Sequence, residues 1–365
     1  MIVFIRRLVI NLPCRSSLSY WYNLGSFLGI SLVIQVISGL FLLLNYNRLE
    51  RYSRIIYIVI EVNYGWFFKI FHRNNARIIF LNLYLHLYKN IMIFSYRLHK
   101  TWNTGLLIIV LIIGAGFSGY VLVGSQISFW AAIVITSLIR VIPINGESLI
   151  YFVWGGFRIN WITLQLLFVV HFILPFLVLI IMVFHLLFLH NRGRTSVLYV
   201  HRGVEKISFF PYFWIKDIVN IVWYLFFIIV LLLYPYSLGE VELFEEANYL
   251  NSPVHIVPEW YFLTSYAILR SVPSKRMGVL IIGMRILVLF LYPLSVGYVR
   301  VPTIYLSHVW FVYMMMQFYL SYLGFSPISQ PYVLLSLLNT FLYFLYHLRI
   351  IFLNVIVRYI FKVIS

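Results

Sequence analysis

Two stretches of this chain decide its fold: WFFKIFHRNNARIIFLNLYLHLYKNIMIF at residues 66–94 and ITLQLLFVVHFILPFLVLIIMVFHLLFLH at residues 162–190. Each stretch is mostly apolar and is long enough to form a membrane-spanning helix, which needs about 20 residues. Each also holds two histidines fourteen positions apart, His72 and His86 in the first and His171 and His185 in the second. Both stretches are therefore predicted to be intramembrane helices with paired histidines.

The rest of the chain follows the same apolar pattern. Of its 365 residues, 63% are hydrophobic and only 10% are charged, which excludes a water-soluble enzyme. Runs of this kind predict an all-α integral membrane protein with eight transmembrane helices, at residues 23–44, 66–94, 103–123, 162–190, 217–236, 278–298, 307–323 and 332–356. The single cysteine, Cys14, excludes an internal disulfide and a Cys-x-x-Cys site within this chain.

The spacing of the histidines has a geometric meaning. Fourteen residues turn a helix by about 1400°, close to four full turns, and advance it by about 21 Å. The two histidines of each helix therefore share a face and lie near opposite surfaces of the membrane. Two such helices would present two His–His pairs, which suit six-coordinate haem iron and electron transfer. A single intramembrane histidine is more often a packing residue, but four at matched depths favour ligands.

Glycines repeat the same interval in two other predicted spans. Gly25 and Gly39 are fourteen residues apart, and so are Gly105 and Gly119. Glycine lacks a Cβ, so a flat macrocycle can approach the helix backbone there, although small-residue helix packing is the simpler explanation for any one of them. The matching interval favours room for haem and predicts a four-helix bundle as the haem-binding scaffold.

Charged residues are divided between the two sides of the predicted membrane protein. Most Lys and Arg residues of the loops fall on the side of the two termini, and eight of the ten acids fall on the other side. This distribution places the termini in the cytoplasm or its organellar equivalent. The net charge of +17 is thus explained by topology and anionic lipid, and nucleic-acid binding is not predicted. Two long loops on the acidic side, 124–161 and 237–277, are candidates for function.

Several motifs of this chain resemble those of the cytochrome b family of quinol–cytochrome c oxidoreductase, the bc1 complex. They include NLPCRSSLSYWYNLGSFLG near the start, TWNTG, SFWAAIVITSLIRVIP, WGGF, HFILPF, HLLFLH, IKD and NSPVHIVPEWYFLTSYAILRSVPSK, with the PEWY signature at Pro258–Tyr261. The resemblance implies a dihaem bundle domain at residues 1–210 and a C-terminal membrane domain at 211–365, with the PEWY loop and the last four helices.

The resemblance also implies a role for each candidate residue. His72 and His171 would ligate the low-potential haem near the acidic loops, and His86 and His185 the high-potential haem near the termini. Glu259 would accept a proton from quinol beside Tyr261, because loss of water at the membrane border favours proton uptake. The oxidation pocket would also include Phe117, Tyr120, Ala131, Ile135, Pro258 and Phe262, and the quinone-reduction pocket Ser26, His190, Lys216 and Asp217.

Some positions depart from the family pattern. Lys69 and Lys89 stand where arginines commonly meet haem propionates, and lysine lacks the planar two-pronged hydrogen bond of arginine. Arg73 and Arg77 are possible substitutes, with snorkelling toward the membrane surface as the alternative. Ala131 replaces a usual glycine, which implies weaker binding of inhibitors that fill the oxidation pocket.

The implied cofactors are two b-type haems, with quinone and quinol as substrates. The implied partners are a Rieske iron–sulfur protein, a cytochrome c1-type subunit and other complex III subunits, in a dimeric complex in the mitochondrial inner membrane with the termini in the matrix. A bacterial membrane is the alternative location. Two other functions stay open: a smaller b-haem protein of the b561 type, and a haem-free transporter or channel with a histidine proton path.

Overall fold

Eight long helices form the body of the molecule. The computed structural model describes residues 10–16, 18–47, 50–192, 206–237, 239–253, 255–295 and 303–364. The long helices within them are α2 (Leu24–Leu43), α4 (Gly65–Met92), α5 (His99–Val121), α8 (Trp161–Arg192), α9 (Tyr212–Leu233), α11 (Lys275–Leu291), α12 (Thr303–Phe325) and α13 (Tyr332–Ile364). Each of the eight predicted spans overlaps one of these helices, and the all-α fold class is confirmed. Residues 296–298 of the sixth predicted span lie outside the described residues.

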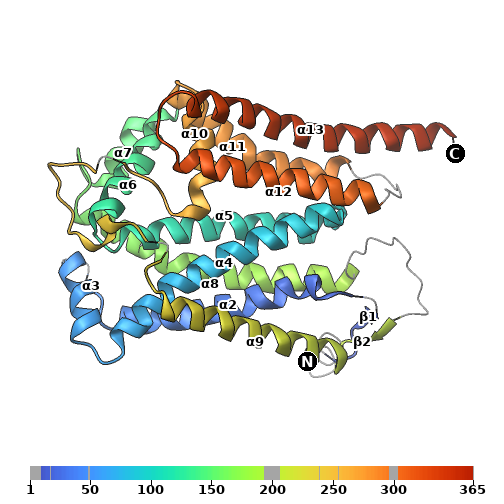
Figure 1. Ribbon diagram of the computed structural model, residues 1–365, viewed down its shortest axis with the longest axis horizontal. Coiled ribbons are helices and arrows are strands. Elements are labelled where there is room, and N and C mark those ends of the chain that lie inside the picture. Colours follow the sequence, from blue (N-terminus) through green and yellow to red (C-terminus); the bar gives the residue numbers. More distant parts are fainter. Residues whose placement is uncertain are drawn as a thin grey trace.

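Within the described residues, six helices are long and apolar enough to cross a membrane, namely those at Tyr20–Leu43, His99–Val121, Trp161–Asn191, Tyr212–Leu233, Lys275–Leu294 and Tyr332–Phe352. The other two long helices, α4 and α12, run alongside these six in Figure 1. Helix α4 has a lower apolar content because it carries Lys69, Arg73, Arg77 and Lys89. Charges at this depth mark candidate functional positions, and α4 is the helix that holds His72 and His86.

The long helices pack in two groups. Helices α2, α4, α5, α8 and α9 form the lower group in Figure 1, and α11, α12 and α13 form the upper one. Helix α2 packs against α4, and α5 against α8. Helix α9 packs on α2 and α4 through a core that includes Phe27, Ile78, Tyr224 and Ile228. The division of the chain at residues 210–211 stays a prediction, and α9 begins directly after it.

Short helices cluster at one end of the bundle, at the left in Figure 1. They are α3 (Arg51–Ile60), α6 (Gln126–Ser137), α7 (Gly146–Trp154) and α10 (Leu263–Arg270), with 3-10 turns η3 (Leu138–Val141), η5 (Val241–Phe244) and η6 (Trp260–Phe262). Most of them belong to the two long acidic-side loops, which are therefore structured as expected. Helix α3 was not predicted, because its ten residues are too few to stand out as a span.

The two acidic-side loops are joined to each other by hydrogen bonds. The backbone N–H of Gln126 donates to the carbonyl of Glu245 at 2.9 Å, and its side-chain Nε2 donates to Asn251 O at 2.7 Å. The indole of Trp130 donates to Asn248 O at 3.2 Å. The backbone carbonyls of Glu245, Asn248 and Asn251 are thereby paired. Helix α6 thus holds the segment that leads to the PEWY turn.

The opposite end carries a small antiparallel sheet of β1 (Pro13–Arg15) and β2 (Lys206–Ser208), in which Cys14 pairs with Ile207. The 3-10 turn η1 (Tyr20–Asn23) leads into α2, η2 (Ser95–Arg97) lies between α4 and α5, and η7 (Tyr292–Ser295) follows α11. The end of α13 points to the same side of the view as the sheet (Figure 1). Several charged residues used to predict the topology, Arg6, Arg7, Arg194, Arg202, Glu205 and Arg300, lie outside the described residues.

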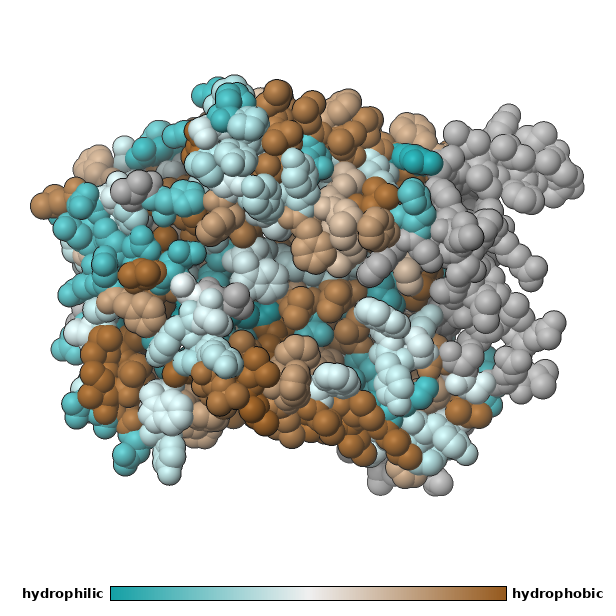
Figure 2. Space-filling view, viewed as in Figure 1, coloured by the Kyte–Doolittle hydropathy of each residue, from teal (hydrophilic) through white to brown (hydrophobic). Residues whose placement is uncertain are grey.

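The surface agrees with a membrane environment. On the face drawn in Figure 2, hydrophilic residues gather at the left end, and hydrophobic residues cover much of the middle. Many large apolar side chains on the long helices are exposed, among them Ile180 on α8 and Trp223 on α9, each 55% exposed. An apolar face of this size needs lipid or a partner to cover it.

Candidate functional site

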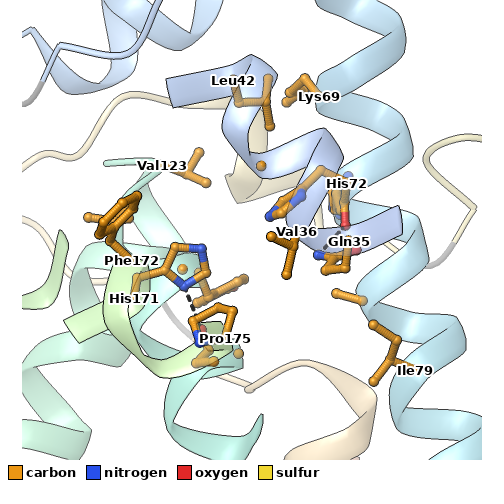
Figure 3. Close-up of a pocket in the computed structure, with 18 of the residues that line it drawn as sticks. Gln35, Val36, Leu42, Lys69, His72, Ile79, Val123, His171, Phe172 and Pro175 are labelled. Carbon is orange, nitrogen blue, oxygen red and sulfur yellow. Dashed lines mark hydrogen bonds between the residues drawn. The ribbon is translucent and has the colours of Figure 1, made fainter. Parts of the chain in front are cut away.

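The first histidine pair lies where α4 and α8 face each other. The rings of His72 and His171 have centres 6.2 Å apart and planes at 83°, and Figure 3 shows them on opposite sides of one pocket. An imidazole nitrogen binds a first-row metal such as zinc at about 2 Å, so two rings on either side of one metal have centres roughly 6 Å apart. The observed spacing therefore fits two axial ligands of a single metal ion.

The tautomers of these rings can be derived from their hydrogen bonds. His171 Nδ1 lies 2.8 Å from the carbonyl oxygen of Ala115, so this nitrogen is the donor. His72 Nδ1 lies 3.0 Å from Ser38 Oγ, and that hydroxyl already donates its proton to Gln35 O. Ser38 Oγ must therefore accept from His72. In both rings Nε2 then carries the lone pair that binds a metal, the usual arrangement of metal-ligating histidines.

The second pair consists of His86 on α4 and His185 on α8. His185 Nδ1 lies 3.0 Å from Thr104 Oγ1, whose proton is donated to the backbone carbonyls of Lys100 and Thr101. His185 therefore has the same tautomer as His72 and His171. Ser38 and Thr104 were not singled out from the sequence, although each stands directly before one of the periodic glycines, Gly39 and Gly105.

Each periodic glycine faces one histidine. A Cβ added to Gly119 would lie 2.4 Å from His171 Cε1, and one added to Gly39 would lie 2.9 Å from His72 Cε1. The corresponding distances are 3.2 Å from Gly105 to His185 and 3.5 Å from Gly25 to His86. The glycines were expected to clear space for a macrocycle. The space that they leave in this structure is taken by the histidine rings themselves.

A cavity of about 290 Å³ lies between the first histidine pair and the acidic-side loops. Its size is close to the lower end of the range for ligand sites, about 300–1,000 Å³. Its walls are mostly apolar, and its polar lining comes from a few residues, which are Gln35, Tyr46, Lys69, His72, Arg73, Tyr120, His171, Glu259 and Tyr261. The cavity thus joins the predicted low-potential haem ligands to the predicted proton acceptor.

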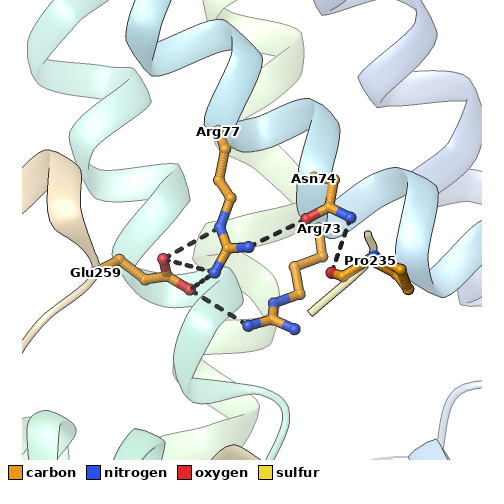
Figure 4. A network of polar contacts seen from close by, with 5 residues as sticks. All are labelled: Arg73, Asn74, Arg77, Pro235 and Glu259. Atoms are coloured by element: carbon orange, nitrogen blue, oxygen red, sulfur yellow. Dashed lines mark hydrogen bonds and ion pairs between the residues drawn. The ribbon is translucent and has the colours of Figure 1, made fainter. Parts of the chain in front are cut away.

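Glu259 has charged neighbours that the sequence did not indicate. Its carboxylate accepts from Arg77 Nη2 at 2.9 and 3.0 Å and from Arg77 Nε at 3.2 Å, and Arg73 Nη2 lies 3.9 Å away (Figure 4). The sequence led us to expect that loss of water would govern this carboxylate. The side chain is indeed buried, and two arginines of α4 also reach it.

Tyr261 is held on the α4 side of the PEWY turn. Its ring stacks on Phe80 with centres 4.0 Å apart, and its carbonyl accepts from Tyr84 Oη at 2.5 Å. The side chain is only 7% exposed, which does not fit an aromatic-belt residue at the membrane surface. Burial, together with the nearby Glu259 carboxylate, raises the pKa of the Tyr261 phenol well above its usual value. Tyr261 therefore stays protonated at neutral pH.

Only part of the predicted oxidation pocket lines this cavity. Tyr120, Glu259 and Tyr261 do, whereas the remaining predicted members do not, these being Phe117, Ala131, Ile135, Pro258 and Phe262. Phe117 packs against a core that includes Val121 and Phe129, and Ala131 is 4% exposed within α6. Phe262 packs instead against Phe80. The extra methyl of Ala131 is thus outside the cavity beside the histidines.

Residues of the predicted second pocket meet between α2 and α9. Ser26 Oγ donates to Asp217 Oδ1 at 2.6 Å, and Asn220 Nδ2 donates to Ser26 Oγ at 2.8 Å. Lys216 Nζ donates to Leu18 O at 2.6 Å. His190 is half-buried near the end of α8. Asn220 was not predicted, and it lies one helical turn beyond the IKD motif that ends at Asp217.

The two lysines have different surroundings. Lys69 lines the cavity one turn before His72, with its Nζ 5.8 Å from the ring centre of Tyr236. Lys89 is 7% exposed, and its Nζ lies 4.7 Å from the ring centre of Tyr22. Lys69 is therefore placed beside the first histidine pair, as its position in the sequence predicts.

Comparison with known proteins covers almost the whole chain. Residues 9–193 match the family described as Cytochrome b/b6/petB, and residues 246–344 match Cytochrome b(C-terminal)/b6/petD. The chain is 44% identical to cytochrome b of Caenorhabditis elegans and of Caenorhabditis briggsae, over 343 residues and 93% of each chain. A solved structure described as a hyperthermophilic respiratory complex III superposes with a TM-score of 0.90 at 25% identity, covering 98% of this chain and 97% of the other. This chain belongs to the cytochrome b family.

Proposed function

We propose that this protein is the dihaem, quinol-oxidising subunit of a quinol–cytochrome c oxidoreductase, respiratory complex III. Membership of the cytochrome b family and the likeness to a complex III structure support this role over a haem-free transporter or channel. The observation that carries the proposal is the His72–His171 pair. Its rings are opposed at 6.2 Å, with Nε2 available for iron, beside a cavity that also contains Glu259.

The chain offers two sets of haem ligands. His72 and His171 would hold the low-potential haem on the side of the acidic loops, and His86 and His185 the high-potential haem on the side of the termini. Lys69 and Arg73, which line the cavity beside His72, would neutralise anionic groups of the first haem. When bound, two b haems supply one-electron carriers that connect the two membrane surfaces.

Protons would be exchanged by different residues at the two surfaces. Glu259 lines the cavity and would receive a proton from quinol, beside the buried and neutral Tyr261. At the other surface, Ser26 and Asp217 are hydrogen-bonded, and together with His190 and Lys216 they would deliver protons to quinone. Release on one side and uptake on the other would contribute to proton translocation.

Of the two electrons of quinol, one would cross the two haems. The acceptor of the other electron must come from outside the chain. We expect a Rieske iron–sulfur protein and a cytochrome c1-type subunit to be required for activity, in a dimeric complex with further subunits and anionic lipid. We expect the complex to lie in the mitochondrial inner membrane, and the excess of Lys and Arg on the side of the termini favours termini that face the matrix.

Spectroscopy and one substitution test the proposal. Reduced-minus-oxidised difference spectra of the purified complex should show two b-type haems for each copy of this chain. Glu259→Gln keeps the size of the side chain but removes its basicity, so quinol oxidation should fall by roughly 100-fold, the scale of general-base catalysis. A complex without b haem would exclude the redox role, and unchanged turnover of Glu259→Gln would exclude its role as proton acceptor.

A further inference from the structure

Arg77 makes a two-pronged contact with Glu259 that neither the histidine pattern nor the family resemblance predicts. Three hydrogen bonds of 2.9–3.2 Å join Nε and Nη2 of the guanidinium to both carboxylate oxygens. The side chain of Arg77 is 4% exposed and that of Glu259 is 8% exposed. Bidentate arginine–carboxylate pairs fix orientation as well as charge, and here the pair is shielded from water.

The guanidinium is itself braced. Arg77 Nη1 donates to Asn74 Oδ1 at 3.2 Å, and Asn74 Nδ2 donates to Pro235 O at 3.2 Å and to Leu231 O at 3.4 Å (Figure 4). The fork of Arg77 is therefore held between its own helix and the end of α9. Its direction is set before any substrate arrives.

The two members of the pair differ in their access to the cavity. Glu259 lines the cavity that contains the histidines, and Arg77 does not. Arg73, the other cation near Glu259, lines the cavity and lies next to His72. Arg77 thus reaches the carboxylate from outside the cavity wall, without occupying the space that a substrate would need.

The planar guanidinium of Arg77 presents Nε and Nη2 to both carboxylate oxygens of Glu259, which fixes the direction in which the carboxylate points. Arg77 can therefore hold Glu259 at one position on the cavity wall.

We propose that Arg77 is a positioning residue for quinol oxidation, which holds the Glu259 carboxylate in one orientation on the cavity wall. This inference rests on the proposed function of Glu259. It gives Arg77 a role separate from haem propionates, which Lys69 and Arg73 would be better placed to meet because they line the cavity. Asn74 takes part as the residue that orients the Arg77 fork.

The experiment measures quinol-dependent cytochrome c reduction by the intact complex, with the spectra of both haems as a check on assembly. Arg77→Gln should lower kcat roughly tenfold and leave KM for quinol within about twofold, because a misplaced base costs rate more than binding. Arg77→Lys should recover part of this loss, since the charge remains but the fork is gone. Asn74→Ala, which keeps both charged residues, should lower kcat by about two- to threefold.

The decisive measurement combines substitutions. If Arg77 acts through Glu259, Arg77→Gln should cause no further loss in a Glu259→Gln background, and the same should hold for Asn74→Ala. A control is Arg140→Gln, which breaks the exposed Arg140–Glu147 pair, with its 3.6 Å contact, and should leave turnover unchanged. Losses that multiply in the double variants, or full activity of both Arg77→Gln and Asn74→Ala, would overturn the inference. If the proposed role of Glu259 as proton acceptor is itself wrong, the result is different, because the Glu259→Gln complex then stays active.

Discussion

Histidines lie within the long helices in both halves of the molecule, but their surroundings differ. His72 and His171 face each other across a cavity, and each has Nδ1 bonded to an oxygen that orients the ring. His347, on α13, is fully buried, accepts or donates a hydrogen bond with the Tyr292 hydroxyl, and has Tyr343 4.4 Å away between ring centres. An intramembrane histidine is thus a ligand candidate only when a second ring and an open space face it.

Buried arginines show the same contrast. In the first half, Arg77 pairs with a carboxylate at the cavity wall. In the second half, Arg285 on α11 donates to Ser265 and to Gln317, and the second of these contacts is 3.2 Å long. Neutral partners satisfy the Arg285 fork, whereas Arg77 is matched by a base that can take part in chemistry. The comparison indicates that Arg285 holds helices of the C-terminal half together, whereas Arg77 belongs to the proposed quinol-oxidation site.

The largest difference should come from substituting one histidine of each kind in separate variants. His72→Leu removes one proposed haem ligand, so we expect the complex to lose the low-potential haem and all quinol oxidation. His347→Gln removes a packing histidine and should leave two haems for each chain. Difference spectra and haem-to-protein ratios measure both. Loss of a haem from His347→Gln, or two normal haems in His72→Leu, would contradict the comparison.

A smaller effect is expected when the space beside a ligand is filled. The Cβ of Gly119→Ala would lie 2.4 Å from His171 Cε1, too close without movement of the ring, whereas Gly283→Ala would meet nothing within 4 Å. Gly119→Ala should therefore weaken or shift the low-potential haem signal, and Gly25→Ala, with 3.5 Å available, should change the other haem much less. Redox titration of both haems checks this order, and Gly283→Ala is the control.

The smallest effect should come from Tyr84→Phe. This change removes the hydrogen bond to the Tyr261 carbonyl and keeps the aromatic ring, so the PEWY turn should loosen at a cost of about 1 kcal/mol. Turnover should fall by about two- to fivefold, with both haem spectra unchanged. Thermal unfolding of the complex, followed together with turnover, separates this local effect from general loss of stability. A fall as large as that of Glu259→Gln would mean that Tyr84 does more than support the turn.

Periodicity explains what could be predicted from the sequence. Apolar runs predict the long helices, and the fourteen-residue interval predicts that His72 and His86 share one helix face, because both depend on residues close together in the chain. The same interval predicts that Gly119 faces His171 once α5 and α8 pack together. The predicted quinol pocket depends on how two loops fold against each other, and only some of its residues line the cavity found here.

Contacts between distant residues could not be predicted in this way. Arg77 and Glu259 are separated by 182 positions, and no local pattern links them. From the sequence, Arg77 had two possible roles, a contact with a haem propionate or snorkelling toward the membrane surface, because its partner Glu259 could not be known. Ser38 and Thr104 could have been found, since a hydroxyl residue precedes a periodic glycine in both cases. Only the helix pairing shows that these hydroxyls meet Nδ1 of His72 and His185.

Helix α4 carries His72, Arg77 and His86 on a single continuous run of turns. A substitution in this helix changes the contacts of one position, whereas a change in its length changes many contacts at once. One residue gained or lost between Arg77 and His86 would rotate everything beyond it by about 100°, so that the helix would keep its alignment at one membrane surface and lose it at the other. The number of residues between Arg77 and His86 therefore matters as much as the identity of the histidines.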